Sequence, residues 1–140
     1  VQAALPAGGV RILVAEDIVV NRAVARGFLN LRGYEADFVE NGAAALEAVQ
    51  AQHYDLVLMD MEMPVMDGLQ ATAAIRALPG PAGQVPIVAL TANALSSART
   101  RCREAGMNDV VTKPINQAEF FGAIDACLGD PAKRQTSAAA

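Results

Sequence analysis

Several charged or hydroxyl-bearing side chains stand where apolar segments of this sequence end. Glu16 and Asp17 follow VRILVA, Asp60 ends YDLVLMD, Thr91 ends VPIVALT, and Lys113 follows DVVT. Segments that are apolar on both faces are typical of strands covered by helices on both sides, as in a parallel sheet. A carboxylate at the end of such a strand is costly to bury unless a cation pairs with it. The first question is therefore what neutralises Asp60.

Two kinds of cation fit these acids. One is the Lys113 ammonium, and the other is Mg²⁺, which binds carboxylate oxygens, carbonyls and waters and leaves room for phosphate oxygens. A zinc cluster is not indicated, because His53 is the only histidine and Cys102 and Cys127 form no C-x-x-C pair. We expect His53 on the solvated surface and both cysteines as reduced thiols.

A carboxylate held beside Mg²⁺ and a lysine can attack a phosphoryl group and form an aspartyl phosphate. Phosphoryl transfer needs positioning, together with cations on the equatorial oxygens. The pattern predicts Asp60 as the nucleophile, with Mg²⁺, Lys113 and the Thr91 hydroxyl each on one phosphoryl oxygen. A purely structural role at a strand end remains open for each acid alone. It does not account for an acidic pair, Asp, Thr and Lys at successive strand ends.

The segments that position these residues alternate between strand and helix. Strands are predicted over 10–17, 34–40, 54–60, 85–91 and 109–112, and helices over 19–32, 43–50, 68–78, up to about 105, and from 116 onward. The cluster PGPAG at 79–83 is predicted to end the third helix and to separate it from the fourth strand. Five such units predict a doubly wound α/β fold with right-handed crossovers and helices on both faces of a parallel sheet. The functional crevice then lies outside the carboxyl ends of the strands, where the strand order reverses.

Local signals support the helices. The first helix is predicted from apolar residues at helical spacing, namely Val20, Val24, Phe28 and Leu31, and the buried face of the last from Phe120, Ile124 and Leu128. Gly33 is predicted to end the first helix and Asn41 to cap the second. Asn116 and Glu119 resemble a capping box.

Composition fits one globular domain. The 140 residues are 53% hydrophobic and 19% charged, with a formal net charge of −4 and a pI of about 4.9, which disfavours direct nucleic-acid binding. No apolar run approaches the roughly 20 residues of a membrane span, and no signal peptide is evident, so we expect a cytoplasmic domain without membrane contact. The chain starts at Val1 rather than Met, which suggests a fragment. We expect linkers at 1–9 and 130–140 around a domain at 10–129.

Over nearly all of 10–129 the chain resembles a response-regulator receiver domain of two-component signalling. The segments that carry the resemblance are ILVAED, the NR at 21–22, NGAAAL at 41–46, YDLVLMDMEMPVMDGL at 54–69, PIVALTANA at 86–94 and AGMNDVVTKPI at 105–115. DMEMPVMDG, ALTANA and KPI are most similar to receivers attached to hybrid sensor histidine kinases.

The resemblance implies a flavodoxin-like (βα)5 fold with strand order 2-1-3-4-5. It implies that Asp60 takes phosphate from a phosphohistidine on a histidine kinase or histidine phosphotransfer domain, and that the domain catalyses its own phosphorylation and dephosphorylation. Mg²⁺ (or Mn²⁺) would be held by Asp17, Asp60 and the Glu62 backbone carbonyl, with Glu16 assisting partly through water. Lys113 would bind the phosphate, and its bond to Pro114 is expected to be cis.

The switch region implied by the resemblance is Thr91, Ala92 and Val110. Many receivers have Tyr or Phe where this chain has Val110, and a β-branched aliphatic has no ring to turn inward. The signal would then pass through shifts of loops and of the helix after Thr91, or the domain would only relay phosphate. Glu62 and Asn93 are expected beside the phosphate, where they could tune its hydrolysis or simply be solvated loop residues.

Several functions remain open on the sequence. The chain could be part of a hybrid sensor histidine kinase, whose parent protein could be membrane-anchored, or a stand-alone single-domain response regulator. A phosphate-independent interaction module would usually lack one of the acids, the Asp or the Lys. A small phosphate-ester hydrolase would need a second catalytic acid, for which Glu62 is the candidate, and a substrate lid.

Overall fold

The computed structural model describes residues 10–92 and 95–128, and strands alternate with helices throughout them. The strands are β1 (Arg11–Ala15), β2 (Glu35–Val39), β3 (Leu56–Asp60), β4 (Ile87–Thr91) and β5 (Asp109–Thr112). The helices are α1 (Val19–Leu31), α2 (Gly42–Ala51), α3 (Gly68–Arg76), α4 (Ser96–Ala105) and α5 (Gln117–Leu128), and the predicted breaker cluster overlaps a short 3₁₀ helix, η2 (Pro81–Gln84). The linkers predicted at 1–9 and 130–140, and Asn93, lie outside the described residues.

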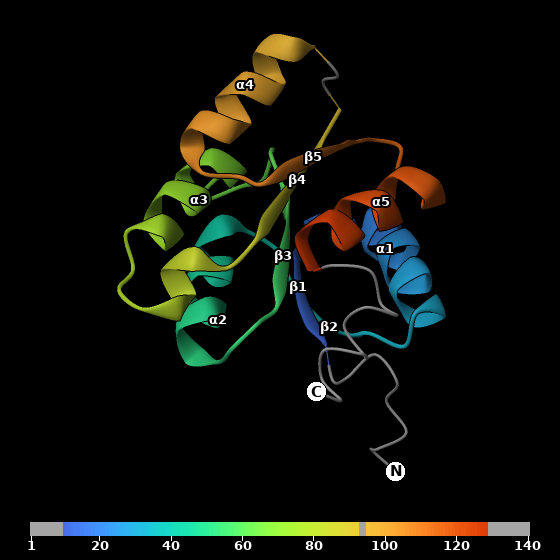
Figure 1. The fold of residues 1–140 in the computed structure, drawn as a ribbon, viewed down its shortest axis with the longest axis horizontal. Helices are drawn as coiled ribbons and strands as arrows, with labels where there is room; N and C mark the ends of the chain where they lie inside the picture. The colour runs from blue at the N-terminus through green and yellow to red at the C-terminus, as the bar shows by residue number, and fades with distance from the viewer. Residues whose placement is uncertain (1–9, 93–94, 129–140) are drawn as a thin grey trace.

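The five strands form one parallel sheet in the order β2-β1-β3-β4-β5. The chain enters the sheet at β1, next to the edge, runs to the edge at β2, and then returns past β1 to the central strand β3 (Figure 1). The strand order therefore reverses between β1 and β3, which is where a doubly wound sheet opens its crevice. The predicted flavodoxin-like fold with order 2-1-3-4-5 is confirmed.

Two helical layers cover the sheet. Helices α1 and α5 lie on one face, and α2, α3 and α4 lie on the other (Figure 1). Residues of β1 alternate between the two cores, with Ile12 and Val14 packed on the first side and Leu13 and Ala15 on the second. All five residues of β3 and all five of β4 are buried, as their uninterrupted apolar patterns predict.

The apolar spacing in α1 predicts a helix correctly but not its buried face. Val20 and Leu31 are 68% and 67% exposed and Val24 is 38% exposed, whereas the buried residues of α1 are Ala25 and Leu29. The small Ala25 lets the helix lie close to the sheet, and Phe28 alone of the predicted set packs against the core. An apolar stripe is consequently left on the solvent side of α1.

Most predicted caps are formed. Asn41 Oδ1 accepts a hydrogen bond of 2.8 Å from a backbone N–H of the first turn of α2, and Gly33 follows α1 with a φ of 72°. Asn116 Oδ1 accepts a 2.8 Å bond from the Glu119 N–H. The Glu119 carboxylate accepts from the Thr112 hydroxyl at 3.2 Å, which ties α5 to β5.

The complete capping box lies at α3, where it was not predicted. Asp67 Oδ1 accepts from Gln70 N at 2.8 Å, and Gln70 Oε1 accepts from Asp67 N at 3.1 Å. Each side chain thereby satisfies a backbone donor of the helix start. Helix α3 ends at Arg76 rather than at residue 78. Among the described residues, no helix has both the length and the apolar character needed to cross a membrane.

Candidate functional site

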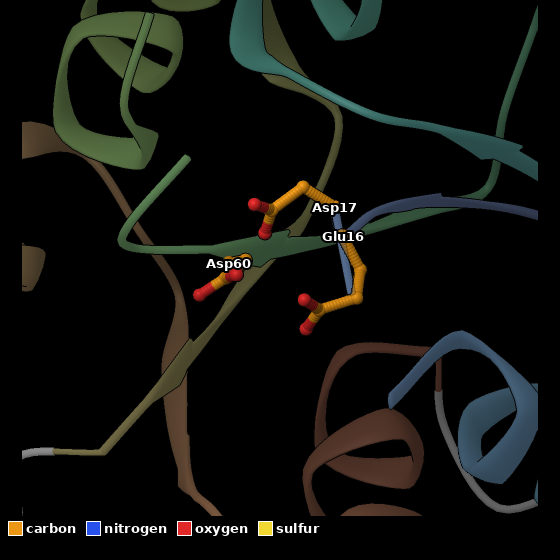
Figure 2. A group of neighbouring side chains, drawn as sticks. All are labelled: Glu16, Asp17 and Asp60. Atoms are coloured by element: carbon orange, nitrogen blue, oxygen red, sulfur yellow. The ribbon is translucent and has the colours of Figure 1, made fainter. Parts of the chain in front are cut away.

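Three carboxylates meet at the carboxyl ends of the two central strands. Glu16 and Asp17 follow the last residue of β1, and Asp60 is the last residue of β3. Figure 2 shows the three side chains gathered there, and one carboxylate oxygen of each lies within 4.8 Å of the others. The predicted acidic cluster is therefore formed, and it lies at the reversal of strand order.

Asp60 is held in a nearly dry setting. Only 3% of the residue is exposed, and its Oδ1 accepts a bond of 3.2 Å from the Glu62 N–H and lies 3.0 Å from Lys113 Nζ. Burial raises the pKa of Asp60 to about 6, although the hydrogen bonds from Lys113 and Glu62 oppose this, and the nearby Glu16 carboxylate raises it further. Any positive charge added beside Asp60 would therefore stabilise its ionised form.

Lys113 is the cation of the site. It follows β5, its peptide bond to Pro114 is cis as expected, and its N–H donates to the Thr91 carbonyl at 2.7 Å. The ammonium lies 3.0 Å from both Glu16 Oε1 and Asp60 Oδ1. Burial lowers the pKa of Lys113, but its bonds to Asp60 and Glu16 outweigh burial, and the net shift is upward. The lysine therefore stays charged and bridges two acids from different strands.

The donor set fits a hard divalent cation. Three carboxylates face one ammonium, so the described site keeps an excess of negative charge when the acids are ionised. Asp17 Oδ1 is buried and has no hydrogen-bond partner, and a buried acceptor of this kind is costly unless something binds it. All the donors are oxygens, which suits Mg²⁺, Mn²⁺ or Ca²⁺ rather than zinc.

The remaining predicted residues lie at different distances from this centre. Thr91 is the last residue of β4 and is buried, and Ala92 follows it on the surface. Val110 lies farther down β5, paired with Ala89, and is buried in the core beneath α4. Glu62 is exposed and reaches Asp60 through its backbone N–H.

One residue that shapes the site was not predicted. A Cβ on Gly68 would lie 2.5 Å from the Asp60 carbonyl oxygen, so only glycine lets the start of α3 come this close to the strand end. Gly68 N–H donates to the Met61 carbonyl at 3.2 Å, which closes the loop after Asp60. The Asp-Gly pair at 67–68 is the turn signal that could have identified it.

The histidine and the cysteines lie apart from this chemistry, as expected. The His53 side chain is 75% exposed, with Nε2 3.2 Å from Asp55 Oδ1. Cys102 and Cys127 are free thiols, Cys102 buried in α4 and Cys127 half-buried in α5. Burial raises the pKa of both thiols, which keeps them in the unreactive protonated form.

Comparisons with known proteins agree with this geometry. Residues 12–125 match the family model of the response regulator receiver domain. The sensor protein GacS of Pseudomonas syringae pv. syringae is 44% identical over 112 residues, a match that covers 79% of this chain and 12% of GacS. The chain therefore spans only a small part of the length of this curated relative.

Solved structures show the same likeness. The receiver domain of sensor histidine kinase PA1611 from Pseudomonas aeruginosa PAO1, solved with a magnesium ion coordinated in the active site cleft, is 42% identical; the match has a TM-score of 0.79 and covers 87% of this chain and 99% of that one. The Saccharomyces cerevisiae co-crystal structure of the histidine phosphotransfer protein Ypd1 with the Ssk1 receiver domain matches at 28% identity and a TM-score of 0.76, over 84% of this chain and 87% of that one.

Fold, site and comparisons point the same way. The strand order and the acidic cluster at its reversal are those expected from the resemblance in the sequence, and the family match spans most of the chain. The chain belongs to the response regulator receiver domains of two-component signalling, and it is most similar to those of hybrid sensor histidine kinases.

Proposed function

We propose that this domain accepts a phosphoryl group from a phosphohistidine onto Asp60. The observation that carries the proposal is the buried Asp60 carboxylate, 3.0 Å from the Lys113 ammonium and grouped with Glu16 and Asp17. In the transfer, the bond between the imidazole nitrogen and phosphorus breaks, and the imidazole keeps the electron pair. A bond between an Asp60 oxygen and phosphorus forms, and a proton on the other ring nitrogen lets the imidazole leave as a neutral ring.

The residues that would hold Mg²⁺ (or Mn²⁺) are Asp17, Asp60 and the Glu62 backbone carbonyl, with Glu16 assisting. The unpartnered Asp17 oxygen supports this assignment, as does the magnesium in the cleft of the PA1611 receiver domain. A bound divalent ion supplies positive charge to the phosphoryl oxygens. It also favours ionised Asp60, which has to be deprotonated to act as a nucleophile.

Lys113 and Thr91 complete the phosphoryl site in this proposal. The ammonium already lies against Asp60 Oδ1, so it is placed to bind a phosphoryl oxygen as negative charge moves onto Asp60. Thr91 ends the neighbouring strand β4, and its hydroxyl would donate to another oxygen. Ala92 follows Thr91 and would move with it.

The partner would be a histidine kinase or a histidine phosphotransfer protein, as in the Ypd1–Ssk1 complex. Next to Glu16 and Asp17, which form the acidic loop between β1 and α1, the start of α1 presents exposed apolar residues, namely Ile18, Val19, Val20 and Val24. We call these four residues the α1 patch. An apolar surface beside a charged site is suited to a partner helix that brings its histidine to Asp60.

The similarity to GacS and to PA1611 supports a place in a hybrid sensor histidine kinase. The receiver would then occupy about 10–129, with linkers at 1–9 and 130–140. Because a histidine kinase takes its phosphoryl group from ATP, such a receiver would work in the cytoplasm.

Intact-mass spectrometry tests the proposal. The protein is incubated with acetyl phosphate and either Mg²⁺ or EDTA, beside Asp60→Asn and the surface control Glu47→Gln. We expect wild type and Glu47→Gln to gain one phosphoryl group with Mg²⁺, and no gain with EDTA or in Asp60→Asn.

Three results would contradict the proposal. An adduct that persists in Asp60→Asn would place the phosphoryl group elsewhere. A folded protein that forms neither an adduct nor a beryllofluoride complex would indicate a phosphate-independent interaction module. Continued turnover of a phosphate ester, rather than labelling that stops at one group per chain, would indicate a hydrolase.

A further inference from the structure

Arg22, in the first turns of α1, reaches back to the end of β1. Its Nη1 donates to the Glu16 backbone carbonyl at 3.3 Å and lies 3.4 Å from Glu40 Oε2, in the loop after β2. The Arg22 side chain is 19% exposed, whereas that of Glu40 is 74% exposed. The contact with Glu16 is therefore the sheltered one, and the ion pair with Glu40 lies in solvent.

The hydrogen bond from Arg22 is one of several contacts that hold Glu16 in place. The Glu16 N–H donates to the Val39 carbonyl at 3.0 Å, Oε2 accepts from Ile18 N–H at 3.1 Å, and Oε1 lies 3.0 Å from Lys113 Nζ. The carbonyl is the remaining polar group of Glu16, and Arg22 binds it. Glu16 is thus held by hydrogen bonds from the start of α1 and to the end of β2, and by an ion pair with Lys113 after β5.

The Glu16 carbonyl matters because it shares a rigid peptide plane with the Asp17 nitrogen. The orientation of that plane sets the direction in which the Asp17 side chain leaves the backbone. Asp17 Oδ1 is buried and without a hydrogen-bond partner, so nothing bonded to that oxygen holds its carboxylate in place. The direction of the backbone therefore contributes to the position of this oxygen relative to Asp60.

We propose that Arg22 is a positioning residue for the carboxylate site, which sets the approach of Asp17 to Asp60 by holding the Glu16 carbonyl. The role rests on the proposed function, because it concerns the cation on which phosphorylation of Asp60 depends. Arg22 acts through geometry. The geometric effect of removing Arg22 on cation affinity is opposite in sign to the effect of removing its charge. Removing a positive charge near three carboxylates would by itself strengthen cation binding, whereas loosening Asp17 weakens it.

The test measures Mg²⁺ binding by isothermal titration calorimetry, well below the unfolding temperature. The variants are Arg22→Gln and the conservative Arg22→Lys, with Arg26→Gln as the matched control. Arg26 lies one turn further along α1, with its guanidinium 4.3 Å from the centre of the Phe38 ring. Circular dichroism checks that each variant is folded, and Arg22→Lys provides a readout if Arg22→Gln is not.

We expect the Mg²⁺ dissociation constant of Arg22→Gln to rise about tenfold, the lower end for residues that orient metal ligands. Arg22→Lys keeps the charge but not the planar fork of donors, and its constant should rise less. Labelling by acetyl phosphate at Mg²⁺ concentrations below saturation should slow in parallel. Arg26→Gln should match wild type in both measurements.

An unchanged or tighter dissociation constant in folded Arg22→Gln, with wild type binding Mg²⁺ and being labelled, would overturn the positioning role alone. A lower unfolding temperature without a change in Mg²⁺ affinity would show that Arg22 only stabilises the fold. If wild type neither bound Mg²⁺ nor became labelled, the proposed function itself would fail, and the role of Arg22 with it.

Discussion

Asp60 combines two demands at one position. It ends a fully buried strand, yet its charge is what the site requires. Burial raises the pKa of Asp60 from 3.8 to about 6, so the ionised form is destabilised while no divalent cation is bound. The burial that destabilises ionised Asp60 in the metal-free protein therefore favours the binding of a cation beside it.

This cost predicts a pH dependence of stability. A carboxyl group whose pKa is higher in the native than in the unfolded state contributes stability below the unfolded pKa. That contribution is lost as the pH rises from about 4 to about 6. Without metal, the free energy of unfolding of Asp60→Asn should therefore increase relative to that of wild type as the pH rises through this range. The increase should be on the order of 2 kcal/mol.

Urea unfolding in EDTA at pH 4 and pH 7 measures the difference. The surface variant Glu47→Gln, on the exposed side of α2, should show no such change relative to wild type. A constant difference between Asp60→Asn and wild type at both pH values would show that the carboxyl is not destabilised in the native state.

At the scale of elements, the loop from Asp60 to α3 contains local strain. Val65 has a φ of 69°, and the Met66 N–H donates to the Pro64 carbonyl at 2.7 Å around it. This is a γ-turn of the rare positive-φ kind, and a β-branched residue is poorly suited to it. The Met66 carbonyl accepts from Gly42 N–H at 2.9 Å, so the turn fastens the loop to α2.

Glycine adopts a positive φ at lower cost than valine, because it has no Cβ. We expect Val65→Gly to raise the free energy of unfolding by about 1 kcal/mol, because the Val65 residue is 81% exposed and little packing is lost. Val19→Gly, at a similarly exposed valine outside the positive-φ residues, should give no gain. Denaturant unfolding of the three proteins measures the difference, and equal stability of Val65→Gly and wild type would exclude strain at this turn.

Helix α1 leads to a prediction about the partner. The α1 patch is exposed beside the acidic loop and contributes little to the core, so it is free to take part in docking. Val20→Lys should slow phosphoryl transfer from a purified histidine phosphotransfer protein at least about tenfold, since a buried interface charge without a partner costs a few kcal/mol. Labelling by acetyl phosphate, which needs no docking, should be unchanged.

The matched control is Leu31→Lys, because Leu31 is 67% exposed at the far end of the same helix. The rates are compared by intact-mass spectrometry at equal concentrations. A loss of labelling by both donors would indicate damage to the Asp60 site rather than to docking, and equal rates from the protein donor would remove the α1 patch from the interface.

At the scale of the whole molecule, the connection between the site and α4 lacks a movable ring. Val110 is 3% exposed and packs in the same core as Cys102 of α4 and Met107. Met61, next to Asp60, places its sulfur 3.8 Å from Cys102 Sγ. A β-branched residue in this packing has little freedom to change rotamer.

We therefore expect beryllofluoride with Mg²⁺ to change NMR amide shifts mainly around Asp60, Thr91 and Lys113, as in a domain that relays phosphate. Val110→Tyr should extend the changes into β5 and α4, because an aromatic side chain is less restricted about χ1 than a β-branched one. Large changes throughout α4 and β5 of wild type would show that the domain switches its outer surface without an aromatic residue.

The alternation of strands and helices, the parallel sheet and the residues at its functional edge all follow from the amino-acid sequence. Runs buried on both faces have no polar alternation, and carboxyl ends of parallel strands meet at one edge. The sequence therefore groups Glu16, Asp17, Asp60 and Lys113, and the structure brings them together.

Which helix faces are covered, and how the side chains of the site are held, depends on tertiary contacts. Helical spacing in α1 could not show that Val20 and Leu31 face solvent, because burial depends on what packs against a helix. The hold of Arg22 on the Glu16 carbonyl is likewise not visible in the sequence, because its acceptor is a backbone atom, which every residue type carries. The Asp-Gly pair at 67–68 signals a turn, but only the structure shows how closely Gly68 approaches the Asp60 carbonyl.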